Sequence, residues 1–151
     1  MNYWAILISI IGSGRVGSAI AFLIASNSLD DVVLLNRTKN KAIGEALDIS
    51  NAIPANSTIS VLGTDDYSKI AGSKIIVVTA STGIYLKNRT EMIDAQVIMI
   101  KEIANKIKDY CNDAIVLIVS NPLDVLTYFF QKETQFSRRK VIGIASSLDS
   151  S

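Results

Sequence analysis

Short apolar runs of strand length recur along the whole chain, and segments with helical periodicity separate them. The runs are Ala5–Ile11, Val32–Leu35, Thr58–Leu62, Ile75–Thr79, Ile115–Ser120 and Val141–Ile144. Because these runs are continuous rather than alternating, they predict strands that are buried on both faces of a sheet.

The segments between the runs predict helices. Apolar residues return at alternating steps of four and three over Arg89–Cys111, which places them on one face of a long helix. Further helices are expected at Val16–Ala25, Lys41–Ala52 and Leu123–Glu133. Pro122 suits the first turn of the last of these. Strands that alternate with helices predict an α/β fold: a doubly wound parallel sheet with right-handed crossovers and helices on both faces.

Composition and charge exclude several classes of protein. A chain of 151 residues that is 49% hydrophobic suits one globular domain and needs no disulfides to fold. Its net charge of +1 offers no basic surface for nucleic acid or for an anionic membrane. No apolar stretch reaches the roughly 20 uninterrupted residues of a membrane helix. The single Cys111 fits a reducing compartment, so we expect a cytoplasmic protein without nucleic-acid or membrane partners.

The residue types available limit the chemistry. The sequence contains no histidine, so any reaction that needs an imidazole must take it from elsewhere. The pairs at 30–31 and 65–66 are aspartates without the spaced ligands of a calcium loop, and we expect no metal. The basic run at 138–140 predicts an exposed turn before a strand.

A glycine-rich loop follows the first predicted strand and opens the first predicted helix. Gly12 permits a tight turn, Gly14 lets the backbone approach a pyrophosphate, and Gly17 lets helix and strand pack closely. The amino end of the helix then presents free N–H groups to the phosphates. The predicted cofactor-binding residues of this loop are Gly12, Ser13, Gly14, Arg15, Val16 and Gly17. A dinucleotide is the leading ligand, and a glycine turn needed only for packing is the alternative.

The end of the second predicted strand bears on the choice of cofactor. An NAD-binding domain normally has an acidic residue there, which accepts hydrogen bonds from the ribose hydroxyls. This chain has Asn36 followed by Arg37, so a 2′-phosphate meets no repulsion and has a guanidinium beside it. The pattern favours NADP, or use of both NAD and NADP. An exposed turn without a role in binding is the alternative.

Three motifs together resemble the malate/lactate dehydrogenase family, and in particular its lactate-dehydrogenase-like malate dehydrogenases. They are the glycine loop, the sequence Asn-Pro-Leu-Asp-Val-Leu-Thr-Tyr at 121–128, and the endings at 141–143 and 148–150. The resemblance covers essentially all of residues 1–151 and implies the N-terminal, Rossmann-type cofactor domain of that family. The chain stops after its last predicted strand without a closing helix, so we expect a substrate domain downstream.

The resemblance implies roles for individual residues near the substrate. Asn121 matches the asparagine that binds the substrate oxygen beside the nicotinamide, although it could also cap the following helix. Arg89 matches the loop arginine that polarises the substrate carbonyl, although it could be a solvated residue at a helix start. Asp149 matches the aspartate that orients a catalytic histidine of the second domain. Further cofactor contacts are implied for Thr79, Ala80, Ser81, Val119 and Asn121.

The substrate loop departs from the family pattern. Gly83 stands where malate dehydrogenases have the arginine for the second carboxylate, and Lys87 is the only other cation of the loop. We therefore assign Lys87 to substrate binding and expect malate and oxaloacetate, or another 2-hydroxy and 2-oxo acid pair. The reaction implied is the oxidation of malate by NAD(P), as in the tricarboxylic acid cycle, by a homodimer or homotetramer. A dinucleotide-sensing module without catalysis and an inert fragment remain as alternatives.

Overall fold

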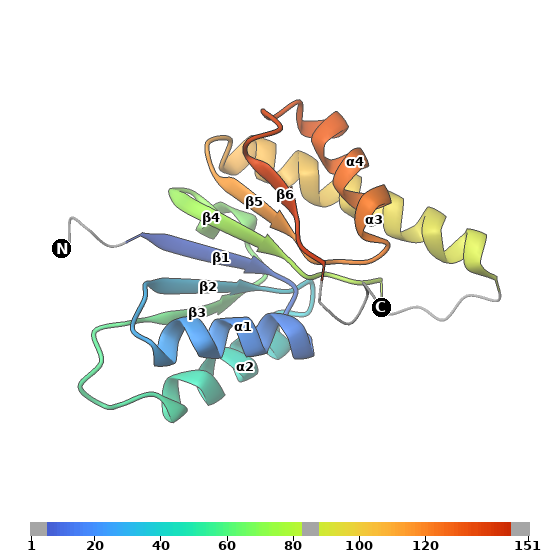
Figure 1. The fold of residues 1–151 in the computed structure, drawn as a ribbon. Helices are drawn as coiled ribbons and strands as arrows, with labels where there is room; N and C mark the ends of the chain where they lie inside the picture. The colour runs from blue at the N-terminus through green and yellow to red at the C-terminus, as the bar shows by residue number, and fades with distance from the viewer. Residues whose placement is uncertain (1–5, 83–87, 146–151) are drawn as a thin grey trace.

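A single parallel sheet forms the centre of the computed structural model, which describes residues 6–82 and 88–145 (Figure 1). Its strands are β1 (Leu7–Ile11), β2 (Asp31–Leu35), β3 (Val61–Thr64), β4 (Ser73–Val78), β5 (Ile115–Ile118) and β6 (Val141–Gly143). They lie in the order β3-β2-β1-β4-β5-β6, and every neighbouring pair is parallel. The chain reverses direction across the sheet between β1 and β4, which is where doubly wound sheets bind ligands.

Helices cover both faces of this sheet, as the sequence predicts (Figure 1). The helices are α1 (Arg15–Ser26), α2 (Lys39–Ala52), α3 (Arg89–Tyr110) and α4 (Leu123–Thr134), with a short 3-10 helix η1 (Tyr67–Ile70) before β4. Helices α1 and α2 lie together on one side, and α3 packs against α4 on the other. The predicted doubly wound α/β fold is confirmed.

The third strand begins later than the sequence predicts. Residues 58–60 precede the strand, and Val61 is the first to pair with β2. The strand includes Gly63, where an added Cβ would lie 2.2 Å from the carbonyl oxygen of Ala42 in α2. A side chain there would push the helix off the sheet, so close packing explains a strand residue that the apolar pattern does not indicate.

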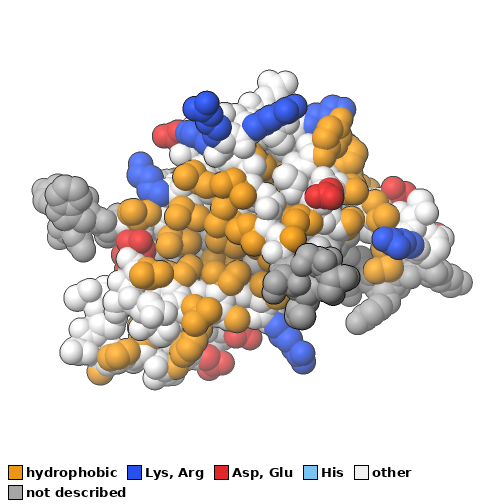
Figure 2. All heavy atoms as spheres, in the orientation of Figure 1, with side chains coloured by type: hydrophobic (Ala, Val, Ile, Leu, Met, Phe, Trp, Pro, Cys, Tyr) orange, Lys and Arg blue, Asp and Glu red, His pale blue; other side chains and the backbone are white. Residues whose placement is uncertain are grey.

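In β5 and β6, burial is complete on only one face of the sheet. Val116, Ile118 and Val141 join the core under α3 and α4, around Phe130. On the opposite face, Ile115 and Ile142 are 41% and 43% exposed. Figure 2 shows hydrophobic side chains gathered over the middle of this side of the molecule. The prediction of burial on both faces is therefore wrong for β5 and β6, because α1 and α2 cover only the other half of the sheet.

Candidate cofactor-binding site

A cleft of about 340 Å³ opens at the carboxyl ends of β1, β2 and β4. Eight residues from the predicted cofactor-binding set line it: Gly12, Ser13, Gly14, Asn36, Arg37, Thr79, Ala80 and Ser81. Its wall is completed by Ile11, Leu35, Thr38, Lys41, Tyr67, Thr82, Met99 and Ile103. Among the described residues, the wall does not include Arg15, Val16, Gly17, Arg89, Val119 or Asn121.

The glycines of the loop have different surroundings. Gly12 has a φ of +116°, and a Cβ there would lie 2.7 Å from the backbone nitrogen of Ala80. A Cβ on Gly17 would lie 1.8 Å from the carbonyl oxygen of Gly12. Gly14 has nothing within 4 Å of such a Cβ. Gly12 and Gly17 are thus required by the turn and the packing, whereas Gly14 leaves open space on the cleft side.

The amino end of α1 follows directly after Gly14 of this loop. The helix has no acidic residue in its first turn, and its N-cap, Gly14, makes no side-chain capping bond. Val16 in that turn is 52% exposed. Free N–H groups and the positive end of the helix dipole attract an anion such as a pyrophosphate.

Asn36 joins the turn after β2 to the glycine loop. Its Nδ2 donates to the hydroxyl oxygen of Ser13 at 2.6 Å, and its Oδ1 accepts from the backbone N–H of Thr38 at 2.9 Å. Ser13 is only 1% exposed, so the contact is well shielded. The amide of Asn36 therefore has a structural task in addition to any contact with a ligand.

Two cations line the part of the cleft that is formed by the turn after β2 and by α2. Arg37 is exposed, and its Nη2 donates to the carbonyl oxygen of Thr82 at 3.3 Å. Lys41, in the first turn of α2, also lines the wall. The sequence predicts Arg37 as a site residue but gives no signal for Lys41, whose place in the wall depends on how α2 packs.

Tyr67 is a further wall residue that the sequence does not predict. It comes from η1 and forms the inner wall with the apolar side chains of Met99 and Ile103. Burial raises the pKa of the Tyr67 phenol to about 12, although the nearby positive charge of Arg37 opposes this increase. The phenol is therefore uncharged at neutral pH, and it adds polarity without charge to a mostly apolar wall.

The segments after β4 and β5 are tied to the glycine loop and to each other. The hydroxyl of Thr79 donates to the carbonyl oxygen of Gly12 at 3.0 Å. The hydroxyl of Ser120 donates to the carbonyl oxygen of Ala80 at 2.6 Å. These bonds hold the floor of the cleft in place between β1, β4 and β5.

Asn121 follows directly and does not cap α4. The helix begins at Leu123, its N-cap is Pro122, and no side chain makes a capping bond there. Asn121 is exposed and precedes Pro122 through a cis peptide bond. The capping alternative for Asn121 is wrong, which leaves its amide available to a ligand.

Arg89 is the first residue of α3 and is exposed. Asn88 caps this helix, because its Oδ1 accepts from the backbone N–H of Glu91 at 2.8 Å. Lys87 and Asp149, which the sequence analysis assigns to substrate binding and catalysis, lie outside the described residues, as does Gly83.

Within residues 6–82 and 88–145, no group of three His, Cys, Asp or Glu side chains could hold a metal ion. In the same part of the chain, no helix combines the length and the apolar character needed to cross a membrane.

Comparison with known proteins agrees with this geometry. Residues 6–143 match the family described as lactate/malate dehydrogenase, NAD binding domain. Malate dehydrogenase from Aeropyrum pernix is 39% identical over 146 residues, which cover 95% of this chain and 47% of that protein. Malate dehydrogenase from Ehrlichia canis is 41% identical over 147 residues, which cover 95% of this chain and 46% of that protein.

A solved structure shows the same fold. Lactate dehydrogenase from Cryptosporidium parvum, complexed with lactic acid and nicotinamide adenine dinucleotide, superposes with a TM-score of 0.88 at 37% identity. The match covers 96% of this chain and 46% of that one, so the chain spans about half the length of these relatives. The chain belongs to the lactate/malate dehydrogenase family and forms its NAD-binding domain.

Proposed function

We propose that this NAD-binding domain also accepts NADP, whose 2′-phosphate would bind beside Arg37. The observation that carries the proposal is the charge of the cleft wall. Of the described residues that line it, none is acidic, and Arg37 and Lys41 are cations. A guanidinium and an ammonium suit a phosphate, whereas the carboxylate usual at the position of Asn36 would repel one.

Titration calorimetry of the purified chain with NADPH and NADH tests this proposal. Arg37→Ala should weaken NADPH binding by about 1.5–3 kcal/mol, the range for a hydrogen bond to a charged group, and leave NADH binding nearly unchanged. Asn36→Asp should shift the preference toward NADH, because a carboxylate can accept hydrogen bonds from the ribose hydroxyls and repels a 2′-phosphate.

Lys39→Ala is the matched control. Lys39 is an exposed cation at the start of α2, close in sequence to Arg37, but it does not line the cleft. Lys39→Ala should leave the affinities for NADPH and for NADH nearly unchanged. Equal losses of NADH and NADPH affinity in the Arg37 variant would contradict a 2′-phosphate site.

We further propose that the whole protein is an NAD(P)-dependent oxidoreductase of 2-hydroxy acids, with malate and oxaloacetate as substrates, as in the tricarboxylic acid cycle. The relatives named malate dehydrogenase support this. When bound, the cofactor supplies or accepts the hydride. Asn121 would hold the substrate oxygen and Arg89 would polarise its carbonyl. Lys87 would bind the second carboxylate, and Asp149 would orient a histidine from outside this chain.

Turnover measurements test these roles. The 151-residue chain has no histidine and should not oxidise malate by itself. In the complete protein, Arg89→Gln should slow hydride transfer roughly 100-fold or more, as when one donor to a developing oxyanion is removed, while cofactor affinity hardly changes. Lys87→Ala should reduce the discrimination between oxaloacetate and pyruvate. A protein that binds cofactor but never turns over would favour a dinucleotide sensor.

We also propose that a substrate domain follows this one and that the assembled protein is a cytoplasmic homodimer or homotetramer. The uncovered apolar face of β5 and β6 supports a further packing partner, because contiguous apolar surface of this kind is normally covered. The greater length of the relatives points the same way. The intact mass of the protein from its natural source tests the further domain when denatured and the oligomeric state when native, and cell fractionation tests the location.

A further inference from the structure

One side chain joins the segment after β4 to the segment after β5. Gln96, in the second turn of α3, accepts a hydrogen bond from the backbone N–H of Thr82 through Oε1 at 3.1 Å. Its Nε2 donates to the backbone carbonyl oxygen of Asn121, also at 3.1 Å. A single carboxamide thus fixes the spacing between two loops that come from neighbouring strands.

The same side chain also ties down the helix that carries Arg89. Gln96 and Arg89 are seven residues apart on α3, which is close to two full turns, so they lie on one face about 10 Å apart along the axis. The bond from Gln96 to Asn121 therefore sets where the first turns of α3 stand relative to Asn121.

Thr82 is held from two sides. Its N–H donates to Gln96, and its carbonyl oxygen accepts from Arg37. Nearer to β4, the bond from Ser120 to Ala80 holds the same segment. Both Ala80 and Thr82 line the cleft, and Ala80 lies next to Gly12 of the glycine loop. Gln96 thus ties Thr82 to the backbone of Asn121, in the segment that follows β5.

We propose that Gln96 is a positioning residue for the nicotinamide end of the cofactor and for the substrate groups beside it. The inference rests on the proposed function. In a doubly wound sheet the pyrophosphate lies at the amino end of α1 and the adenosine lies toward β2, so the nicotinamide lies toward β4 and β5. Both backbone bonds of Gln96 are to the segments that follow β4 and β5, so its loss should weaken mainly the contacts with the nicotinamide half of the ligand.

The test compares two ligands on the purified chain. NADH contains both nucleosides, whereas ADP-ribose has the adenosine and pyrophosphate but lacks the nicotinamide. Gln96→Leu removes both hydrogen bonds at similar side-chain volume. We expect its NADH affinity to fall about tenfold, the scale for lost hydrogen bonds of ordinary strength, and its ADP-ribose affinity to stay within about twofold.

A second variant separates the two bonds and protects the test against misfolding. Gln96→Glu has the same shape and keeps an acceptor for the N–H of Thr82, but it offers no donor to the carbonyl of Asn121. Its NADH affinity should lie between that of the wild type and that of Gln96→Leu. Amide hydrogen exchange of Thr82 should be faster in Gln96→Leu than in Gln96→Glu, which a general loss of stability would not produce.

Gln131 provides a matched control. It is a partly buried glutamine on α4, and its Nε2 donates to the backbone carbonyl oxygen of Phe136 at 2.9 Å, outside the cleft. Gln131→Leu should lower the melting temperature about as much as Gln96→Leu and change neither ligand affinity.

The outcomes distinguish this inference from the proposed function. A wild-type chain that binds neither NADH, NADPH nor ADP-ribose overturns the proposed function and this inference with it. A wild-type chain that binds them, with Gln96→Leu weakening NADH and ADP-ribose equally or neither, overturns this inference alone. Selective loss of NADH in Gln96→Leu, absent in Gln131→Leu, supports it.

Discussion

The strands of the sheet begin at one edge, the amino edge, and end at the other, the carboxyl edge. These two edges use similar polar side chains for different purposes. At the carboxyl edge, Asn36 and Thr79 bond to the backbone or side chains of other loops and hold them around an open cleft. Toward the amino edge, the hydroxyl of Ser9 in the middle of β1 lies 2.6 Å from that of Ser73, the first residue of β4, and both residues are buried. The first group of contacts holds loops around a binding site, whereas the second lies inside the sheet and stabilises the fold.

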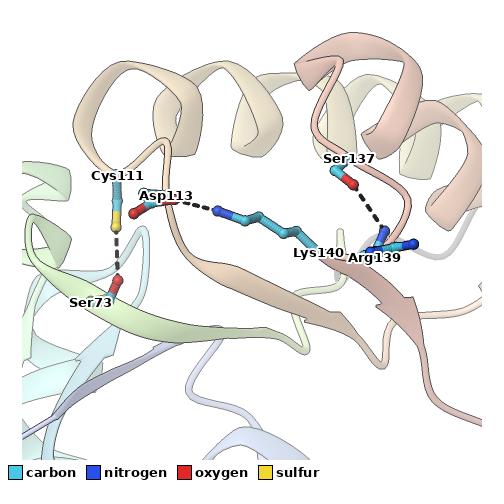
Figure 3. A network of polar contacts seen from close by, with 6 residues as sticks. All are labelled: Ser73, Cys111, Asp113, Ser137, Arg139 and Lys140. Carbon is cyan, nitrogen blue, oxygen red and sulfur yellow. Dashed lines mark hydrogen bonds and ion pairs between the residues drawn. The ribbon is translucent and has the colours of Figure 1, made fainter.

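The surroundings of the amino edge strengthen this contrast (Figure 3). The thiol of Cys111 donates to the carbonyl oxygen of Ser73 at 3.2 Å, and burial raises the pKa of that thiol. Nearby, Lys140 pairs with Asp113 and lowers the pKa of its carboxyl group. The hollow beside these residues measures about 220 Å³, smaller than the cleft. The turn predicted at 138–140 is confirmed here, with the backbone N–H of Arg139 donating to Ser137.

The largest expected effect lies at the carboxyl edge. Gly17→Ala would place a methyl group 1.8 Å from the carbonyl oxygen of Gly12 and 2.8 Å from the hydroxyl oxygen of Thr79. Helix α1 would have to move away from the sheet. We expect a loss of about 3 kcal/mol or more in the free energy of unfolding and the loss of cofactor binding, measured by denaturant titration and calorimetry.

Two other glycines serve as controls for this substitution. Neither Gly14 nor Gly44 has an atom within 4 Å of an added Cβ. Gly44→Ala, inside α2, should raise stability by about 0.5–1 kcal/mol and leave binding unchanged. Gly14→Ala should leave stability unchanged but weaken cofactor binding. If all three variants behaved alike, close packing at Gly17 would not be the cause.

The next effect appears at high pH. The pKa of Tyr67 is about 12 in the folded chain against 10.0 for an ordinary tyrosine, so the folded state keeps a proton that the unfolded state releases. Its contribution to stability is complete below pH 10 and is lost as the pH rises toward 12. At pH 12 the loss approaches about 2 kcal/mol.

Tyr67→Phe should remove this part of the pH dependence, measured by denaturant titration at pH 8, 10 and 11.5. Tyr128→Phe is the matched control, because Tyr128 is 57% exposed. The same slope of stability against pH in Tyr67→Phe and wild type would show that burial in the cleft wall does not control this group.

The smallest effect tests the amino edge. Ser73→Ala would leave the buried hydroxyl of Ser9 without its partner, which costs about 1–2 kcal/mol of stability. Cofactor affinity should not change, because Ser73 lies at the opposite end of β4 from the cleft. The double variant Ser9→Ala, Ser73→Ala should recover part of the loss. A change in NADH affinity would mean that the two edges are coupled.

The sequence alone determined the order of strands and helices and the glycine loop. Both depend on local features: apolar runs, helical periodicity, and the small residues between β1 and α1. Together with the family resemblance, the sequence also identified half of the residues of the cleft wall, because the carboxyl ends of parallel strands share one edge of the sheet.

Only the tertiary structure decided the remainder. The late start of β3 depends on its pairing with β2 and on the contact between Gly63 and α2. The open face of β5 and β6 depends on how far α1 and α2 extend across the sheet. Tyr67 and Gln96 join the site through contacts with residues far away in sequence. Local patterns report which face of an element is apolar, but packing between distant elements determines which polar groups meet.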